Sequence, residues 1–452
     1  MTDVLTTRVP SVDDIVATAR TGFDALRSAD AGTRAGWLEA VAREIDTAAD
    51  SIAADIHADT GKPPKWAAIE VERAASIVRL AAREAVALHP EAQRLDAQPS
   101  GVGRLALTVR VPRGPVLALA PFNFPLHLTV HKVAPAIAAG ASVVVVPSPR
   151  TPRTAAAFAG VLERAGLPDG AVHVAPASPD HTLTWELIRD PRLPVVSVTG
   201  SDPVGWRIVD AVPRKQVVAE LGGNAAAVIA PDLVGLDDLR HAASRIATFA
   251  FYNAGQACTS PQRVYVPRDR LGEFTDLLVT QARAQDLHAD VGPVIDDAGA
   301  DRIRRWITDA VAGGARVATG DDGTSHPDGD ARFIRPTVLI EPPEDARVLT
   351  EEVFGPVVSV LAYEDIDDAL RAVDDSRYGL SVGIFTHDVR LAFRAGAELE
   401  VGQVVIGDVP TFRSDVTPFG GVKGSGRGRE GVRATIEDYT VTRTVVFAEA
   451  GW

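Results

Sequence analysis

The stretch Val143-Val144-Val145-Val146 decides the fold class of this chain. Four consecutive β-branched residues before a proline are typical of a short strand that is buried on both faces. Similar apolar runs follow at 171–174, 195–198 and 216–219, and helical segments lie between them at 154–165, 181–189 and 204–212. Short strands that alternate with helices predict an α/β fold with a parallel, doubly wound sheet.

A second series of the same kind occupies the carboxyl-terminal half. Strands are expected at 225–229, 263–266, 357–362, 382–385 and 404–406, with helices at 236–252, 271–284, 298–312, 366–374 and 389–396. Ahead of both series, amphipathic patterns predict helices at 11–29, 31–57 and 66–87, the first capped by Ser11. Residues 105–111 and 116–120 form either a hairpin or a separate pair of strands. Residues 320–330 are expected to form a surface loop, because they are rich in glycine and aspartate.

Composition excludes several functional classes. The 452 residues carry a formal net charge of -14, which argues against nucleic acid as a partner because phosphate binding needs a basic surface. The first residues lack the basic start and apolar core of a signal peptide. No apolar run approaches the roughly 20 residues that span a bilayer, so no membrane partner is expected. We therefore expect a cytoplasmic protein.

Cys258 is the only cysteine of the chain. It has no partner for an internal disulfide or a thiolate metal site, and no metal is expected. A buried, inert thiol is the ordinary interpretation of such a residue. However, Asn253, Gly255 and Gln256 interrupt an apolar helical run just before it. This interruption favours a sulfur at the end of an element, where a ligand reaches it.

Two other stretches carry candidate chemical groups. In Pro121-Phe122-Asn123-Phe124-Pro125, two prolines fix the backbone around one asparagine. This is either a rigid turn that aims the amide at an oxyanion or an apolar turn with an incidental asparagine. Glu220 directly follows the strand at 216–219 and precedes two glycines. Its carboxylate is expected on the ligand side of a parallel sheet, and the alternative is a solvated loop carboxylate.

Three stretches suggest nucleotide binding without proving it. Thr199-Gly200-Ser201-Asp202-Pro203 ends a strand and begins a helix, which suits either phosphate oxygens or simple helix capping. Glu352 and Phe354 share one side of an extended segment and suit a ribose and a flat ring, unless they belong to an acidic loop. The glycine-rich residues 418–431 indicate flexibility or close backbone packing. A phosphate-cradling loop is the alternative, although no helix start like that of a P-loop is evident.

Taken together and in this order, these motifs resemble those of the aldehyde dehydrogenase superfamily. The resemblance extends from Thr60-Gly61-Lys62-Pro63 to Gly431, and it also includes Gly255-Gln256-Ala257-Cys258 and Pro418-Phe419-Gly420-Gly421-Val422-Lys423. It implies an oxidoreductase that uses NAD or NADP, with two doubly wound αβα domains and a small β oligomerisation element. The implied cofactor-binding domain covers 1–102 and 113–222, the catalytic domain 223–431, and the oligomerisation strands 103–112 and 432–452. The implied assembly is a homodimer or homotetramer. The alternating pattern of residues 440–447 predicts a terminal strand that must pair somewhere, and a partner subunit is a reasonable place.

The resemblance also implies roles for individual residues. Cys258 would attack the aldehyde carbon to give a thiohemiacetal, and Asn123 with the backbone amide of Cys258 would hold the oxyanion. Glu220 would activate the water that hydrolyses the thioester, and Lys132 would support the proton network. The implied cofactor-binding residues are Phe122, Ser148, Arg150, Gly200, Ser201, Gly205, Leu221, Gly222, Glu352 and Phe354. Because relatives that transfer the acyl group to coenzyme A typically lack the glutamate, Glu220 favours hydrolysis over a coenzyme A-acylating reaction.

The chain departs from the family pattern at the adenosine end of the cofactor site. Val146 and Pro149 stand where the family usually has a lysine and a glutamate that contact the adenosine ribose. The choice between NAD and NADP therefore stays open, with Arg150 or Arg153 as candidate partners of a 2′-phosphate. The same departure supports an alternative hypothesis, a cofactor-impaired relative with a binding or structural role.

The stretch Asp408-Val409-Pro410-Thr411-Phe412-Arg413 is similar to relatives that act on small aldehydes with an anionic or hydroxylated tail. Arg413 could pair with a carboxylate, phosphonate or sulfonate, although a surface role is an equal alternative. Some such relatives carry an arginine just before the cysteine, where this chain has Ala257. The candidate substrate-binding residues are Phe124, His127, Ala257, Thr259 and Arg413.

Overall fold

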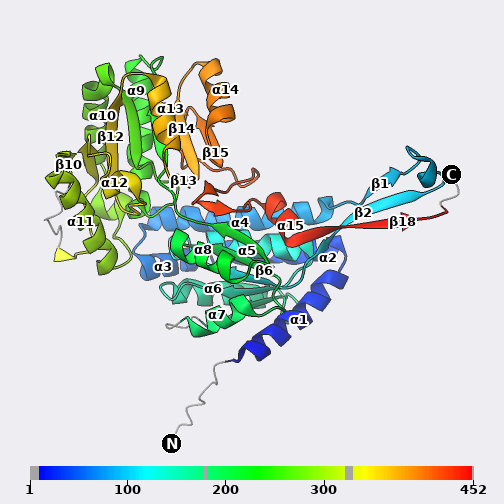
Figure 1. Ribbon diagram of the computed structural model, residues 1–452. Helices are drawn as coiled ribbons and strands as arrows, with labels where there is room; N and C mark the ends of the chain where they lie inside the picture. Colours follow the sequence, from blue (N-terminus) through cyan, green and yellow to red (C-terminus); the bar gives the residue numbers. More distant parts are fainter. Residues whose placement is uncertain (1–9, 177–180, 321–328, 450–452) are drawn as a thin grey trace, which may run out of the picture.

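The computed structural model describes residues 10–176, 181–320 and 329–449. They form two open, mostly parallel sheets with helices on both faces and a small antiparallel sheet that projects from the body as an arm (Figure 1). The predicted α/β fold class is therefore confirmed. No helix in these three ranges is both long and apolar enough to cross a membrane.

The first sheet has the strand order β17-β7-β6-β3-β4-β5. Its strands are β3 (Val116–Leu119), β4 (Val143–Val146), β5 (Val172–Val174), β6 (Val195–Thr199), β7 (Gln216–Glu220) and β17 (Gly426–Arg427), and only β17 is antiparallel to its neighbour. Every residue of β4 is buried, as its four valines predict. Val143 and Val145 join the core on one face of the sheet, and Val144 and Val146 join the core on the other.

Helices cover both faces of this sheet. The elements are α1 (Val12–Ser28), α2 (Ala31–Thr47), α3 (Ala49–Thr60), α4 (Pro64–Ala87), α5 (His127–Ala139), α6 (Pro152–Arg164), α7 (Thr182–Arg189), α8 (Asp202–Ala211) and α15 (Val432–Tyr439). Every residue of α5 is buried, and it packs in one core with α2 and α4. The predicted Ser11 cap is present as a full capping box with Asp14.

The second sheet has the order β10-β11-β12-β9-β8-β14-β15. Its strands are β8 (Ala226–Ile229), β9 (Arg263–Pro267), β10 (Arg316–Thr319), β11 (Thr337–Ile340), β12 (Val357–Tyr363), β14 (Ser381–Phe385) and β15 (Gln403–Ile406). Its helices are α9 (Leu236–Phe251), α10 (Leu271–Arg283), α11 (Asp297–Ala312), α12 (Arg347–Thr350), α13 (Ile366–Asp374) and α14 (Val389–Glu398). The short strands β13 (Tyr378–Gly379) and β16 (Val422–Lys423) pair with each other. Strands β10 and β11 were not predicted, and most of the loop predicted at 320–330 lies outside the described residues.

Several predicted boundaries were wrong. The helix expected at 31–57 is two helices, α2 and α3, which meet at Ala48. Neither glycine nor proline marks this break, so the helical periodicity runs through it. The segment 432–452 was expected to form strand, but its first part is helix α15, because Val432, Ile436 and Tyr439 repeat at helical spacing and are buried.

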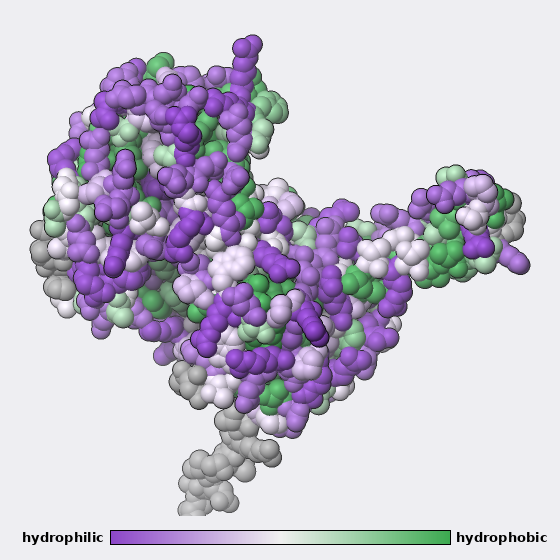
Figure 2. Space-filling model, viewed as in Figure 1, coloured by the Kyte–Doolittle hydropathy of each residue, from purple (hydrophilic) through white to green (hydrophobic). Residues whose placement is uncertain are grey.

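The arm consists of β1 (Glu91–Arg94), β2 (Leu105–Pro112) and β18 (Thr440–Phe447). Strand β18 pairs with β2 along all eight of its residues. The hairpin alternative for 105–120 was wrong, because β2 lies in the arm and β3 in the first sheet. Strand β1 was also missed, and it adds Glu91–Arg94 to the arm. Val445, Val446 and Phe447 are exposed, and Figure 2 shows apolar surface on the arm.

Candidate active site

A cavity of about 710 Å³ lies at the ends of strands β3, β6 and β7. It is also lined by residues such as Cys258 and Glu352, from the part of the chain that forms the second sheet. Ligands bind parallel sheets at this edge. Most of the predicted site residues line the cavity: Phe122, Asn123, Phe124, His127, Ser148, Gly200, Ser201, Glu220, Leu221, Gly222, Ala257, Cys258, Thr259, Glu352, Phe354 and Arg413. Lys132, Arg150 and Gly205 do not.

Cys258 reaches the cavity because the helix before it stops abruptly. After α9, Asn253 and Ala254 adopt positive φ, and Gly255 follows with φ +68°. A Cβ on Gly255 would lie 2.1 Å from the carbonyl oxygen of Gly355, so no other residue fits there. Burial raises the pKa of the Cys258 thiol to about 12, and the nearby carboxylates Glu352 and Glu220 add to the shift. The thiol therefore needs help to ionise.

The amide of Asn123 is held next to this thiol loop. Its Nδ2 donates to the carbonyl oxygen of Gln256 over 3.0 Å, which leaves a second N–H for the cavity. Its own backbone oxygen accepts hydrogen bonds from Lys62 over 2.7 Å and from Asn253 over 3.1 Å. The turn is therefore fixed by its backbone as well as by its two prolines.

Glu220 is the last residue of β7 and is buried. Neither carboxylate oxygen has a hydrogen-bond partner among the described residues. Burial raises the pKa of Glu220 well above its ordinary value, and the charge of Glu430 raises it further. An unpaired carboxylate with a raised pKa is suited to accept a proton from a molecule in the cavity.

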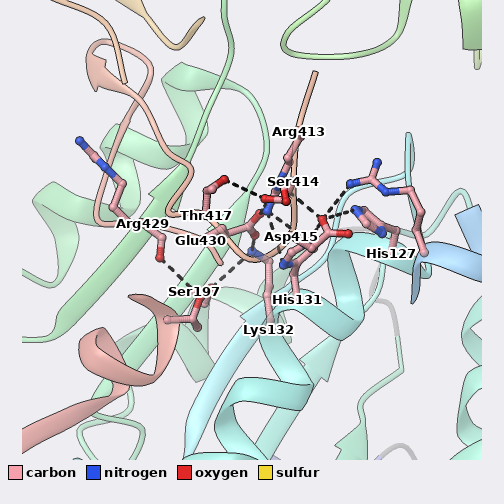
Figure 3. Close-up of polar contacts among 12 residues, drawn as sticks. His127, His131, Lys132, Ser197, Arg413, Ser414, Asp415, Thr417, Arg429 and Glu430 are labelled. Atoms are coloured by element: carbon pink, nitrogen blue, oxygen red, sulfur yellow. Dashed lines mark hydrogen bonds and ion pairs between the residues drawn. The ribbon is translucent and has the colours of Figure 1, made fainter. Parts of the chain in front are cut away.

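Figure 3 shows a chain of charged side chains formed by Lys132, Glu430 and Arg413, and their charges act on the nearby Glu220. Lys132 on α5 donates to Glu430 over 3.0 Å and to the hydroxyl of Ser197 over 3.3 Å. Burial alone would raise the pKa of Glu430, but Lys132 and Arg413 outweigh it and hold this pKa low. Lys132, Ser197 and Glu430 do not line the cavity. Glu430 is linked to it through Arg413, which does. Glu430 was missed by the sequence analysis, although it lies in the glycine-rich stretch.

A second polar cluster lies beside it and includes His127, His131 and Asp415 (Figure 3). Arg73 from α4 donates to Asp415 over 2.8 Å, and Arg413 contacts the ring of His131 over 3.2 Å. One ligand atom from each of the two histidines and the aspartate lies within 4.8 Å of the others, a spacing that a metal ion could use. The two guanidinium groups disfavour a cation there.

Two buried polar atoms of this region lack hydrogen-bond partners among the described residues. They are Nδ1 of His127 and Nε of Arg413. Burial lowers the pKa of His127 well below its ordinary value, and the positive charges of neighbouring groups such as Arg73 and Arg413 lower it further. The cluster therefore favours an anion or an acceptor group over a cation.

The other end of the cavity has features that suit a dinucleotide. The start of α8 faces it, and nothing lies within 4 Å of a Cβ built on Gly200, so the space beside this helix start is open. Glu352 accepts from the N–H of Gly223 over 3.0 Å, and burial raises its pKa to about 7. A Cβ on Gly222 would lie 2.6 Å from a carboxylate oxygen of Glu352, which explains that glycine. Phe122 and Phe354 meet edge to face with ring centroids 5.9 Å apart.

Two predicted cofactor residues lie elsewhere. Arg150 forms an ion pair with Asp296, which caps α11. Gly205 packs against Leu221, the residue after strand β7, because a Cβ there would lie 2.1 Å from the side chain of Leu221. Besides Arg73, the cavity is lined by two further arginines that the sequence analysis missed, Arg302 and Arg377. They come from α11 and from the loop before β13, and no local motif marks them.

Comparisons with known proteins agree over almost the whole chain. A family model described as "Aldehyde dehydrogenase family" matches residues 1–445. The chain is 38% identical over 395 residues to a 3-sulfolactaldehyde dehydrogenase of Priestia megaterium, covering 86% of this chain and 80% of that protein. It is 34% identical over 433 residues to a lactaldehyde dehydrogenase of Methanococcus maripaludis, covering 94% and 89%.

Solved structures give the same result. Aldehyde dehydrogenase 21 from Physcomitrella patens, in complex with the reaction product succinate, matches with a TM-score of 0.92 and 35% identity, covering 97% of this chain and 91% of that chain. The NADP-dependent glyceraldehyde-3-phosphate dehydrogenase from Bacillus halodurans, complexed with NADP, matches with a TM-score of 0.91 and 31% identity at the same coverage.

Proposed function

Because this chain belongs to the aldehyde dehydrogenase family and is an NAD(P)-dependent enzyme of that family, we propose that it oxidises a small aldehyde with an anionic or hydroxylated tail to the carboxylic acid. The observation that carries this proposal is the shared cavity of Cys258, Asn123 and Glu220. A nucleophile, an oxyanion donor and a base with no competing partner meet there.

In the first step, the sulfur of Cys258 bonds to the aldehyde carbon and the thiol proton passes to a base. Glu220 is the candidate base, because its raised pKa brings its proton affinity closer to that of the thiol. The carbonyl oxygen gains negative charge, and the free N–H of the Asn123 amide and the backbone amide of Cys258 stabilise it. A well-placed donor of this kind contributes about 3 kcal/mol to the barrier reduction.

When bound, the oxidised nicotinamide would supply a hydride acceptor and a positive charge. The residues that would hold the cofactor are the start of α8 at Gly200 and Ser201 for the phosphates, the carboxylate of Glu352 for a ribose, and Phe354 beside the ring. Their positions around one open cavity support this assignment. After oxidation, the acyl group is a thioester on Cys258.

Once the proton gained from the thiol has passed to solvent, Glu220 takes a proton from water as the water oxygen attacks the thioester carbon. The carbon–sulfur bond then breaks and releases the sulfur of Cys258 as a thiolate. The low pKa of Glu430 keeps a negative charge near Glu220, which strengthens Glu220 as a base. A buried glutamate in this position supports hydrolysis over acyl transfer to coenzyme A. The product is a free acid.

The tail of the substrate would lie against Arg73, His127 and Arg413. The two guanidinium groups and the unpartnered Nδ1 of His127 support a carboxylate, phosphonate, sulfonate or hydroxyl group there. Some relatives have an arginine at the position of Ala257, and in this chain Arg73 could provide the second positive charge instead. The related sulfolactaldehyde and lactaldehyde dehydrogenases, by their names, act on small aldehydes of this kind.

For the cofactor, we propose that both NAD and NADP remain candidates. Related structures are described as complexed with NADP or as NAD-dependent. Val146 and Pro149 carry no charge that could bind the adenosine ribose of NAD or of NADP, and Arg150 forms an ion pair with Asp296. A calorimetric titration with each dinucleotide separates the two, and binding of neither would favour the cofactor-impaired alternative.

For the assembly, we propose a homo-oligomer built through the arm. Strand β18 uses one edge to pair with β2, and its other edge pairs with no described strand. Apolar residues on such a free edge support pairing with a second copy.

The test is reduced-cofactor formation by purified protein across a panel of anionic, hydroxylated, aliphatic and aromatic aldehydes, with each dinucleotide and with and without coenzyme A. Turnover that needs no coenzyme A and disappears in Cys258→Ala supports the proposal. A requirement for coenzyme A, or equal turnover in the variant, would refute it.

A further inference from the structure

Two buried charges that take no part in the proposed chemistry lie against the turn that carries Asn123. Lys62, from the connection between α3 and α4, forms an ion pair with Glu70 on α4. Their side chains are 0% and 1% exposed. A buried ion pair loses its hydration, so it persists only where further hydrogen bonds satisfy both groups.

The ammonium group of Lys62 makes two further contacts, both with the turn that carries Asn123. Its Nζ donates to the backbone oxygen of Asn123 over 2.7 Å and lies 4.1 Å from the ring centroid of Phe124. A charge-assisted hydrogen bond and a cation–π contact therefore act on two successive residues. Together with the bond from Asn253, they fix the orientation of the Asn123 peptide.

Glu70 holds the other end of the same turn. Its Oε1 accepts from the backbone N–H groups of Leu126 over 3.0 Å and His127 over 3.2 Å. These are the first N–H groups of α5, and Leu126 at the N-cap position has no side-chain oxygen to satisfy them. The carboxylate of Glu70 acts as the missing cap, and its charge is favourable at a helix start.

We propose that Lys62 and Glu70 are positioning residues that clamp the turn at both ends and so aim the Asn123 amide at the oxyanion. The inference rests on the oxyanion role proposed for Asn123. The Nδ2 of Asn123 already gives one N–H to Gln256, so only one direction remains for the other. A rotation of the Asn123 peptide would turn that N–H away from the cavity.

The test is a double-mutant cycle between the clamp and Asn123. The combined variant Lys62→Met/Glu70→Gln removes both charges at once and leaves no single buried charge behind. We expect it to lower kcat on the order of tenfold to hundredfold with an unchanged dissociation constant for the dinucleotide. In an Asn123→Ala background, the same two substitutions should lower kcat less than about twofold, because the amide they position is gone.

A matched control separates positioning from general stability. Leu38→Ala in α2 removes a fully buried side chain from the core that α4 shares, without touching the turn. It should lower the melting temperature and leave kcat per folded enzyme unchanged. If the combined variant does not fold, Lys62→Arg, which keeps the charge but alters the donor geometry, enters the same cycle.

The outcomes distinguish the two proposals. If Asn123→Ala alone leaves kcat unchanged, its proposed oxyanion role is wrong. The other outcome is that Asn123→Ala lowers kcat, while the clamp substitutions lower kcat by the same factor in the Asn123→Ala background as in the unmodified enzyme. In that case Asn123 keeps its proposed role, and the positioning inference is overturned.

Discussion

Arg413 donates from both terminal nitrogens to one carboxylate oxygen of Glu430, each over 3.2 Å. Lys132 donates to the other oxygen of the same carboxylate over 3.0 Å. Arg413 was predicted as a contact for the substrate tail, and it does line the cavity. Its ion pair links the proposed substrate end of the cavity to the buried charges near Glu220.

Arg413→Met should therefore lower kcat for every aldehyde and not only weaken the binding of anionic ones. Loss of the guanidinium removes one of the two cations that hold the pKa of Glu430 low, so its charge becomes less favourable. We expect a decrease in kcat of about tenfold or more, since a partner of a buried charge is lost. Steady-state kinetics with one anionic and one neutral aldehyde measure it. A change confined to KM for the anionic aldehyde would contradict this link.

Arg73→Met should have the opposite selectivity. Arg73 binds Asp415 and lines the cavity but has no contact with Glu430, so its loss should raise KM for anionic aldehydes about tenfold and leave neutral ones nearly unchanged. Arg79→Met is the matched control, because Arg79 lies on the same helix and pairs with Asp46 at the surface. Equal effects of the two substitutions would exclude Arg73 from the substrate site.

The sequence predicted the residues whose position follows from local structure. Glu220 follows a strand and precedes two glycines, and Cys258 follows an interrupted helix, so both could be placed at the cavity before the fold was known. Lys62, Arg73 and Asp415 could not, because long-range packing brings their segments together. Arg150 looked suitable by its place in the chain, but its side chain turns to Asp296. The break between α2 and α3 was missed because residues on both sides of Ala48 favour helix.

The reactivity of Cys258 should depend steeply on pH. Burial favours the neutral thiol and raises its pKa to about 12, so the thiolate fraction grows about tenfold for each pH unit across the neutral range. Labelling of the cofactor-free protein with iodoacetamide should accelerate accordingly between about pH 7 and 9 without levelling off. Mass spectrometry follows a single modified site, and Cys258→Ala gives the blank because no other cysteine exists. A plateau below pH 8 would show that another group ionises the thiol.

The exposed edge of β18 should control assembly. Val446→Glu places a charge on a strand whose outer residues are exposed and apolar, and desolvating that charge between two copies is unfavourable. Size-exclusion chromatography with light scattering should show a smaller species than the unmodified protein. Ile69→Glu, a similarly exposed position on α4, is the control and should leave the mass unchanged. A monomeric unmodified protein would rule out the proposed arm contact.

Glu220→Gln should show whether Glu220 is the base in both steps of the proposed reaction or only in the hydrolysis of the thioester. The amide is nearly isosteric but cannot take a proton from water, so hydrolysis of the thioester should slow by about a hundredfold or more. In the unmodified enzyme, hydrolysis should accelerate with rising pH through the raised pKa of Glu220, because only the ionised carboxylate acts as a base. The variant should lose this rise.

Rapid-mixing absorbance of the reduced cofactor tests both points. If Cys258 is ionised without Glu220, either by another base or by the positive charge of the oxidised cofactor, the variant should still release a burst of reduced cofactor. The burst should reach up to one equivalent per site and be followed by a slow steady rate. A variant without any burst would instead place Glu220 in thiol ionisation, because the thioester would never form. A variant with full turnover and an unchanged pH profile would show that Glu220 is not the base.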